Sequence, residues 1–218
     1  MPKRGGSSGV GGAMPPAVPP QPVPTDPFAN GLPPDTDMEG PNNSYSDEDA
    51  RIQYIKDRIP GISDSEARAY AEAVYTFSGS GSMGMRLAIT GKGASHFLAE
   101  AQYVEDYIKA APRWEGGRTY RGLDDVDISN FPVGATNIDM RGMASWSRDY
   151  GVAESFAGHG KPSQHIVLNC KTQSKGTKIR SLSHYYNEQE VLVSNEARYR
   201  VVKHIPHSNY TEVVLEEM

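Results

Sequence analysis

The spacing of apolar residues changes once along this 218-residue chain, at Pro112, and that change limits the folds available to it. Before Pro112, apolar residues recur every three or four positions, which is typical of amphipathic helices. After it, short runs rich in β-branched and aromatic residues are separated by Gly, Asn and Ser, which is typical of strands and turns. Helices followed by strands, without alternation, predict an α+β fold rather than a parallel α/β sheet.

Three helices are expected before Pro112, and the third spans about residues 95–111. The first two begin at capping-box-like pairs, in which a serine precedes an acidic residue by three positions. These pairs are Ser46 with Asp49 and Ser63 with Glu66, and Pro60 ends the first helix. The apolar faces predict a core made of Ile52, Ile55, Ile59, Ala67, Ala71, Val74, Tyr75, Phe97, Ala101, Val104 and Ile108.

Seven strands are expected in the second part of the chain. They are Arg118–Leu123, Met143–Ser147, His165–Cys170, Lys178–Leu182, Gln189–Ser194, Tyr199–His204 and Thr211–Glu216.

Residues 1–44 differ in composition from the rest, because they hold 11 of the 16 prolines and 7 of the 22 glycines. Proline lacks a backbone donor, glycine makes order entropically costly, and few apolar residues here could be buried. We therefore expect a disordered tail over 1–44, serving as a tether or as a delivery or partner-binding signal. One globular catalytic domain is expected over 45–218.

Composition argues against several classes of protein. The net charge is −5 with scattered Lys and Arg, so no nucleic-acid partner is indicated. A single cysteine, Cys170, excludes an internal disulfide and fits a reducing compartment. No run approaches the roughly 20 apolar residues of a membrane helix. The basic start lacks an apolar segment after it, so no secretory signal peptide is expected and the protein is expected to act in a cytoplasm.

Two common ligand motifs fail on their context. Gly79–Gly84 matches G-x-G-x-x-G and Glu100 lies about twenty residues later, but a helix rather than a strand precedes the glycines. A flexible Gly/Ser loop is expected there instead. The histidines form no H-x-x-x-H pair and Cys170 has no cysteine partner, so no metal site is expected.

Three short segments with polar residues are informative when they are considered together. They are Tyr120–Gly122, Ser145–Ser147 and Glu188–Glu190, each in or beside an expected strand. Taken singly, an arginine in a strand is ordinarily solvated or ion-paired, and two acidic residues are ordinarily a surface pair. Residues i and i+2 of a strand share one face, which predicts that Glu188 and Glu190 lie side by side.

In order, these segments resemble the R-S-E motif of arginine-directed mono-ADP-ribosyltransferases, the group of clostridial-toxin-like enzymes and vertebrate ecto-enzymes. The similarity runs from about residue 46 to the end of the chain. It includes the flanking stretches Tyr107–Arg113, Gly117–Leu123, Phe131–Gly134 and Ala153–Phe156. One departure is Trp146, where the family usually has a small residue. The middle side chain of a strand triplet points away from its neighbours, so the site can tolerate it. The alternative, that Trp146 changes the packing behind the pocket, stays open.

The resemblance implies an enzyme that cleaves NAD, its substrate, at the nicotinamide–ribose bond and passes ADP-ribose to a target protein. Cleavage develops positive charge on the ribose, which the family's second glutamate, here Glu190, opposes. Arg121 is implied to bind the NAD phosphates. Ser145 is implied to orient Glu190 by a hydrogen bond, and Ser147 to assist.

The same resemblance assigns the remaining site residues. Phe156 is implied to pack on the nicotinamide ring, and Tyr120 and Gly122 to flank Arg121 at the NAD site. Glu188 is implied to activate an acceptor arginine, whose guanidinium is a poor nucleophile until a carboxylate engages it. The acceptor loop is implied to contain Tyr185 and Tyr186.

The family fold implied is a helical N-terminal lobe on two small, mostly antiparallel sheets, in a bacterial or phage effector. Two alternatives stay open: an NAD glycohydrolase that uses water as acceptor, and a non-catalytic interaction module on the same fold. The residues do not decide against a nucleic-acid acceptor, and they do not identify the target.

Overall fold

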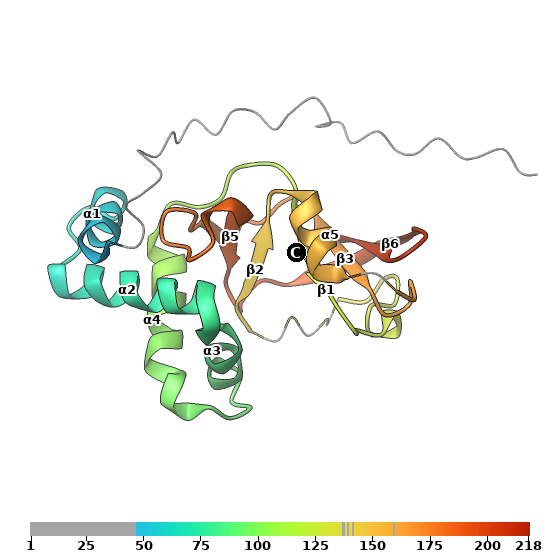
Figure 1. The fold of residues 1–218 in the computed structure, drawn as a ribbon, viewed down its shortest axis with the longest axis horizontal. Helices are drawn as coiled ribbons and strands as arrows, with labels where there is room; N and C mark the ends of the chain where they lie inside the picture. Colours follow the sequence, from blue (N-terminus) through green and yellow to red (C-terminus); the bar gives the residue numbers. More distant parts are fainter. Residues whose placement is uncertain (1–46, 137, 139, 141, 159) are drawn as a thin grey trace, which may run out of the picture. The chain divides into compact units, whose positions relative to one another are not determined.

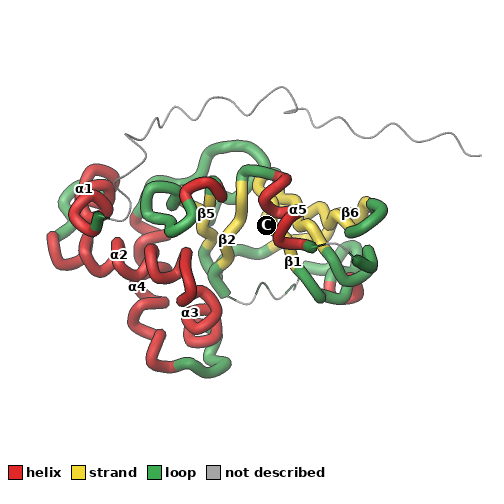
Figure 2. The backbone as a smooth tube through the Cα atoms, in the orientation of Figure 1, coloured by secondary structure: helices red, strands yellow, loops and turns green. Residues whose placement is uncertain are grey.

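A computed structural model describes residues 47–136, 138, 140, 142–158 and 160–218. The expected disordered tail, residues 1–44, and the expected helix start at Ser46 lie outside the described residues. In the described part, four α-helices come before the first strand and a fifth lies between strands (Figure 1). Helices α1 to α4 gather on one side, and the strands lie on the other side together with α5 (Figure 2), so the predicted α+β fold is confirmed.

Helices α1 (Glu48–Arg58) and α2 (Asp64–Thr76) have side-chain caps. The cap of α1 is Asp47, whose carboxylate accepts the Asp49 backbone N–H at 2.9 Å. The predicted capping box of α2 is confirmed, because Ser63 Oγ accepts the Glu66 N–H at 3.2 Å and Glu66 Oε2 accepts the Ser63 N–H at 3.3 Å. Each cap satisfies donors that a helix start leaves unpaired.

The expectation of a flexible loop over Gly79–Gly84 is wrong. A π-helix, η1 (Phe77–Gly81), continues α2 directly into α3 (Ser82–Ile89), with a kink at Gly79 (φ −96°, ψ −124°). The glycines allow close packing: a Cβ on Gly81 would lie 2.8 Å from the Thr76 side chain, and one on Gly84 would lie 2.4 Å from the Phe97 ring. The segment is therefore packed, and a helix precedes the glycines as expected.

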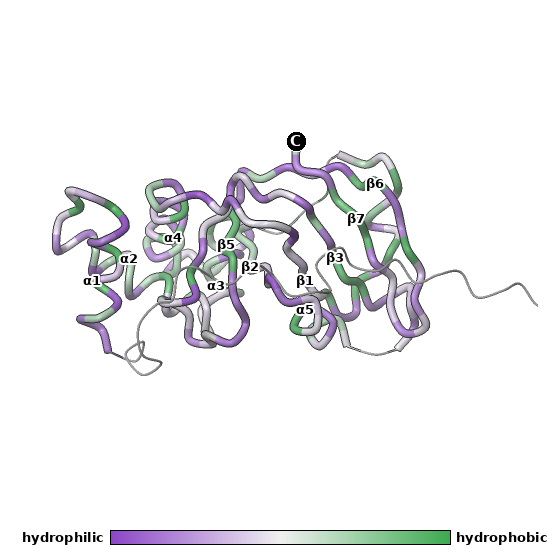
Figure 3. The backbone as a smooth tube through the Cα atoms, turned by 90° about the horizontal axis from the view of Figure 1, so that it is seen from above, coloured by the Kyte–Doolittle hydropathy of each residue, from purple (hydrophilic) through white to green (hydrophobic). Residues whose placement is uncertain are grey.

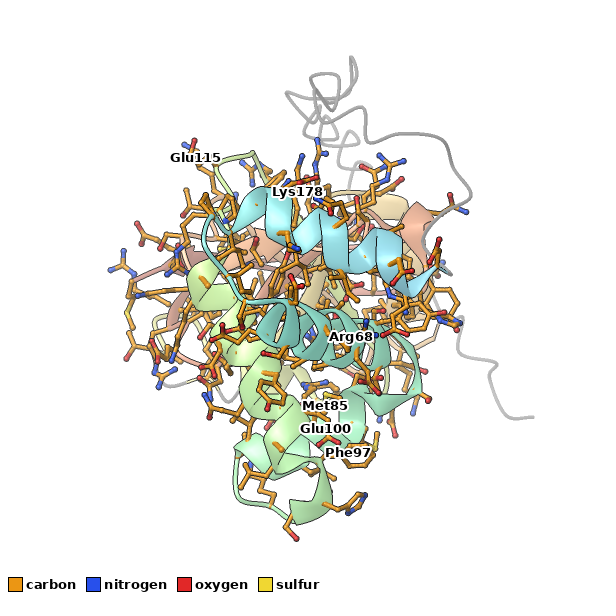
Figure 4. All side chains as sticks on the ribbon, turned by 90° about the vertical axis from the view of Figure 1, so that its left-hand side faces the viewer. Arg68, Met85, Phe97, Glu100, Glu115 and Lys178 are labelled. Atoms are coloured by element: carbon orange, nitrogen blue, oxygen red, sulfur yellow. The ribbon has the colours of Figure 1, made fainter. Side chains whose placement is uncertain are left out.

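Helix α4 (Leu98–Ala110) follows a 3₁₀ turn, η2 (Ser95–Phe97), and completes the helical layer. Figure 4 looks onto this layer and shows Met85 of α3 and Phe97 close to one another at the base of α4. Most of the predicted inner faces are confirmed by one buried cluster that includes Ile52, Ile55, Ala67, Ala71, Val74, Phe77, Met85, Ala101, Val104, Tyr107 and Ile108. Ile59 and Phe97 are partly buried against this cluster, whereas Tyr75 lies outside it and contacts Arg51 and His184.

The strands form one seven-stranded sheet in the order β4-β5-β2-β1-β3-β7-β6. All neighbours are antiparallel except β3 and β7. The strands are β1 (Thr119–Leu123), β2 (Ala144–Ser147), β3 (Ile166–Cys170), β4 (Gly176–Lys178), β5 (Glu190–Val193), β6 (Tyr199–Pro206) and β7 (Thr211–Glu217). Figure 3 shows the hydrophobic stretches of β3, β5 and β7 that supply much of the core of the sheet.

Two separate sheets were expected, and the structure joins them through a weak seam. Strands β1 and β2 share the single paired position Tyr120↔Ser147, whereas β1 and β3 share five. Arg121 on β1 and Ser145 on β2 both line a cavity at this seam. The seam keeps the sheet continuous and still leaves room for a cavity.

One strand is misplaced in the sequence-based expectation. Residues 178–182 were expected to be extended, but the strand is Gly176–Lys178 and a turn follows it. The carbonyl of Ile179 accepts the N–H groups of Leu182 and Ser183, both at 2.7 Å. Ile179 and Leu182 are both fully buried, because a turn brings residues three apart onto one side. The two apolar side chains are therefore buried because of a turn and not because of strand alternation.

Helix α5 (Tyr150–Ala157) packs directly against β1. The contact needs a glycine: a Cβ on Gly122 would lie 2.0 Å from the Ala153 carbonyl oxygen and 2.4 Å from the Ala157 nitrogen. The helix is capped by Asp149, which accepts the N–H groups of Gly151 and Val152. No helix in the described residues is long and apolar enough to cross a membrane.

Candidate functional site

A cavity of about 370 Å³ lies where the helical layer meets the opening between β1 and β2. Every predicted site residue whose side chain the structure describes lines it: Tyr120, Arg121, Gly122, Ser145, Ser147, Phe156, Tyr185, Glu188 and Glu190. The side chain of Tyr186 lies outside the described part of the structure. Residues far apart in the sequence thus converge on one hollow.

Glu190, the first residue of β5, is the buried carboxylate of the cavity, with 4% of its surface exposed. Its Oε2 accepts the Ser183 hydroxyl at 2.8 Å, and the Ser145 side chain also hydrogen-bonds it. Burial raises the pKa of Glu190 to about 7. The two serine hydrogen bonds and the positive charge of Arg121 oppose that rise, and the neighbouring charge of Glu188 adds to it.

Arg121 bridges the opening between the two strands. Its Nη1 donates to the Ser145 carbonyl oxygen at 3.2 Å, in place of a ladder hydrogen bond. The guanidinium also borders an adjoining cavity of about 470 Å³, which shares Arg86, Arg121 and Gly122 with the first. Arg121 therefore places a permanent positive charge between two connected hollows.

Glu188 reaches the cavity by a route that differs from the prediction. It ends a 3₁₀ turn, η4 (Tyr186–Glu188), and is not in a strand. Gln189 follows in the left-handed conformation (φ 48°, ψ 49°), so strand alternation does not relate the two glutamates. The Ser147 hydroxyl holds the turn by donating to the Glu188 carbonyl at 2.7 Å, and burial raises the pKa of Glu188.

Aromatic side chains form part of the cavity wall. Phe156 of α5 lines the cavity with 56% of its surface exposed. Tyr120 is buried, with its ring 5.0 Å from that of Tyr150 in an edge-to-face contact. Tyr185 is 51% exposed, and its ring meets His184 edge to face at 4.9 Å. An exposed ring beside a hollow can stack on a planar ligand.

Trp146 lies between two cavity-lining serines and itself borders the cavity. Its side chain is 1% exposed and packs against Tyr199, with ring centroids 5.7 Å apart, in the hydrophobic cluster of the sheet. Ser145 and Ser147, one position to either side, contribute to the cavity.

Sequence reasoning missed one wall of the cavity and one hydrogen-bonding residue. The wall is the π-helix and the start of α3, whose lining residues are Phe77, Ser78, Gly79, Ser82 and Arg86. Ser78 Oγ accepts the His184 N–H at 2.7 Å and so ties this wall to the loop before Glu188. The other omission is Ser183. The strand expected over residues 178–182 hid the turn that holds Ser183, and the position of Ser183 seven residues before Glu190 carries no recognisable signal.

The fold of this chain is shared with solved structures of other proteins. No protein-family model matches the chain, and no curated protein matches it either. Among solved structures, the Vis toxin of Vibrio splendidus is 25% identical over 85% of this chain and 90% of Vis, with a TM-score of 0.58. The chain has the ADP-ribosyltransferase fold.

Two further structures of this fold are also similar. Exoenzyme S from Pseudomonas aeruginosa is 20% identical over 78% of this chain and 88% of its own, with a TM-score of 0.57. The eucaryotic mono-ADP-ribosyltransferase ART2.2 is 17% identical over 79% and 75%, with a TM-score of 0.58. Vis has been solved with agmatine, and exoenzyme S with carba-NAD and human 14-3-3 protein beta. In the described residues of the present chain, no group of three or more potential metal ligands gathers.

Proposed function

We propose that this chain is a mono-ADP-ribosyltransferase that uses NAD as substrate and modifies an arginine of a target protein. The observation that carries the proposal is the convergence of Arg121, Ser145, Glu188 and Glu190 on one cavity, around a buried carboxylate that two serines hold. The fold shared with Vis, exoenzyme S and ART2.2 supports the general chemistry.

Glu190 is suited to stabilise the reacting ribose. When the bond between ribose C1′ and the nicotinamide nitrogen breaks, nicotinamide leaves with the electron pair and the ribose becomes cationic. A carboxylate fixed in a cavity with little water opposes that charge more strongly than one in solvent. Ser145 and Ser183 keep the carboxylate from rotating, so it needs no reorganisation at the moment of cleavage.

Arg121 is suited to bind the phosphates of NAD, and Phe156 is suited to bind its nicotinamide ring. The guanidinium offers two parallel N–H donors that match phosphate oxygens, and it lies between the two cavities that an extended dinucleotide would need. The exposed Phe156 ring, on the wall of the first cavity, offers a flat surface for nicotinamide.

Glu188 favours arginine as the acceptor. It is partly exposed, lies on the turn that follows Tyr185 and lines the cavity, whereas Glu190 is buried. There its carboxylate can take a proton from an incoming guanidinium as the new bond from nitrogen to ribose C1′ forms. The structure of Vis with agmatine, a small guanidinium compound, supports this assignment. The Vis toxin and the type III effector XopAI from Xanthomonas axonopodis, which is 14% identical with a TM-score of 0.58, support a role as a toxin or effector. Action in a cytoplasm is part of the proposal.

The test is to incubate the full chain with NAD, alone and with agmatine, and to measure nicotinamide release and ADP-ribosyl-agmatine separately. We expect agmatine to be modified and to accelerate nicotinamide release. Nicotinamide release without any labelled acceptor, even with host lysates, would favour the glycohydrolase. Absence of both products would favour a non-catalytic module and overturn the proposal.

A further inference from the structure

Ser183 connects the buried carboxylate to the loop that follows it. Its side chain is 1% exposed, its hydroxyl donates to Glu190 Oε2 at 2.8 Å, and its oxygen accepts the Tyr185 N–H at 3.1 Å. The backbone N–H of Ser183 is itself fixed by the Ile179 carbonyl at 2.7 Å. The residue is thus anchored on the turn after β4 and not on the strands that carry the R-S-E segments.

The polarity of this pair of hydrogen bonds is determined. A serine hydroxyl has one proton, and a backbone N–H can only donate. Because the Tyr185 N–H occupies an acceptor position on Ser183 Oγ, the single proton is free to point at Glu190. The position of the Tyr185 N–H therefore affects how the Ser183 hydroxyl donates to the Glu190 carboxylate.

We propose that Ser183 is a second positioning residue of the site, which fixes the Glu190 carboxylate together with Ser145 and couples it to the loop of Tyr185 and Glu188. The consequence for catalysis rests on the proposed function, whereas the hydrogen bonding does not. The two serines come from different elements, β2 and the turn after β4, so together they restrict rotation of the carboxylate more than either one alone.

The charged groups that face Glu190 are Arg121 from β1 and Glu188 from η4. Burial favours the protonated form of Glu190, and hydroxyl donors favour the ionised form. Loss of the Ser183 hydroxyl therefore raises the pH at which Glu190 ionises. It should also narrow the pH range in which the carboxylate can oppose positive charge.

The chain contains a matched control in the same turn. Ser181 is fully buried, and its hydroxyl has no hydrogen-bond partner within the described residues. Ser183→Ala and Ser181→Ala each remove one buried hydroxyl, two positions apart, and only the first of them removes a contact with Glu190.

The experiment follows the ¹³C carboxyl signal of Glu190 with pH in the full chain, assigned by its absence in Glu190→Gln. We expect the ionisation midpoint to rise by about one pH unit in Ser183→Ala, as loss of a hydrogen bond to a charged group predicts, and to stay unchanged in Ser181→Ala. In NAD cleavage, the acid limb of kcat should move upward in Ser183→Ala. At pH 7 its kcat should fall about fivefold, because the ionised fraction of Glu190 falls from about one half to about one tenth, while KM for NAD changes less than about twofold.

Equal midpoints in the two alanine variants would overturn the assignment of Ser183. If Ser183→Ala does not fold while Ser181→Ala does, Ser183→Thr decides, since threonine retains the hydroxyl. A wild-type midpoint in that variant supports the assignment, and a midpoint raised by about one unit overturns it. A wild-type chain that does not cleave NAD would refute the proposed function, but the NMR titration would still test Ser183.

Discussion

Replacement of Glu190 by glutamine should stabilise the fold while it removes activity. The side chain is almost fully buried, and burial is the largest influence on its pKa, so the folded protein pays to keep this group ionised at high pH. Glutamine has nearly the same shape as the protonated acid, and the hydroxyls of Ser145 and Ser183 can hydrogen-bond an amide as well as a carboxylate.

The magnitude follows from the rise in the pKa of Glu190 from 4.5 to about 7 on folding. Between those values the folded state binds more protons than the unfolded state, so the contribution of Glu190 to stability falls as pH rises. Each pKa unit corresponds to about 1.36 kcal/mol. Above pH 8 the raised pKa of Glu190 therefore lowers the free energy of unfolding by about 3 kcal/mol. At pH 5 the same effect lowers the free energy of unfolding by less than about 1 kcal/mol.

The assay is urea unfolding of wild type and Glu190→Gln at pH 5 and at pH 8.5. The free energy of unfolding of the variant should exceed that of wild type by about 3 kcal/mol at pH 8.5 and by less than about 1 kcal/mol at pH 5. Glu72→Gln, an exposed site on α2, is the control and should change neither value. A variant that is no more stable than wild type at pH 8.5, or equally stabilised at both pH values, would refute the reasoning.

Four other outcomes are expected. Glu188→Gln should retain slow NAD hydrolysis but lose nearly all agmatine transfer; equal loss of both activities would mean that the glutamates are misassigned. Arg121→Lys should weaken NAD binding by about 1–3 kcal/mol in calorimetry, and an unchanged Kd would mean that Arg121 does not bind the NAD phosphates. Gly122→Ala should destabilise the fold by about 3 kcal/mol or more in urea, because its Cβ would lie 2.0 Å from the Ala153 oxygen. Removal of residues 1–44 should leave the thermal midpoint and NAD cleavage unchanged, and a tenfold loss would place the tail within the domain.

Local spacing was sufficient for the features that depend on neighbours along the chain. Ser63 and Glu66 predicted a helix start because a capping box closes within one turn, whatever lies further away. The alternation of Ser145, Trp146 and Ser147 predicted that the Trp146 side chain packs away from the two serines, because successive strand residues point to opposite faces.

Other features depended on contacts that local spacing does not encode. The packed π-helix at Phe77–Gly81 was predicted as a loop, because glycine favours both flexible segments and close packing. The turn after Lys178 was predicted as a strand, because buried residues three apart and two apart are hard to distinguish in a short apolar run.

The sequence by itself therefore determined the α+β class, the helix faces and the identity of the residues brought to the cavity, because these follow from short-range periodicity and from ordered motifs. The tertiary structure decided how those residues meet. Glu188 and Glu190 share the cavity because Gln189 turns the chain in the left-handed conformation. The cavity lies at the seam where β1 and β2 pair at one position only, and Ser183 reaches Glu190 from a turn. Such arrangements depend on packing between segments far apart in the chain, which no local pattern specifies.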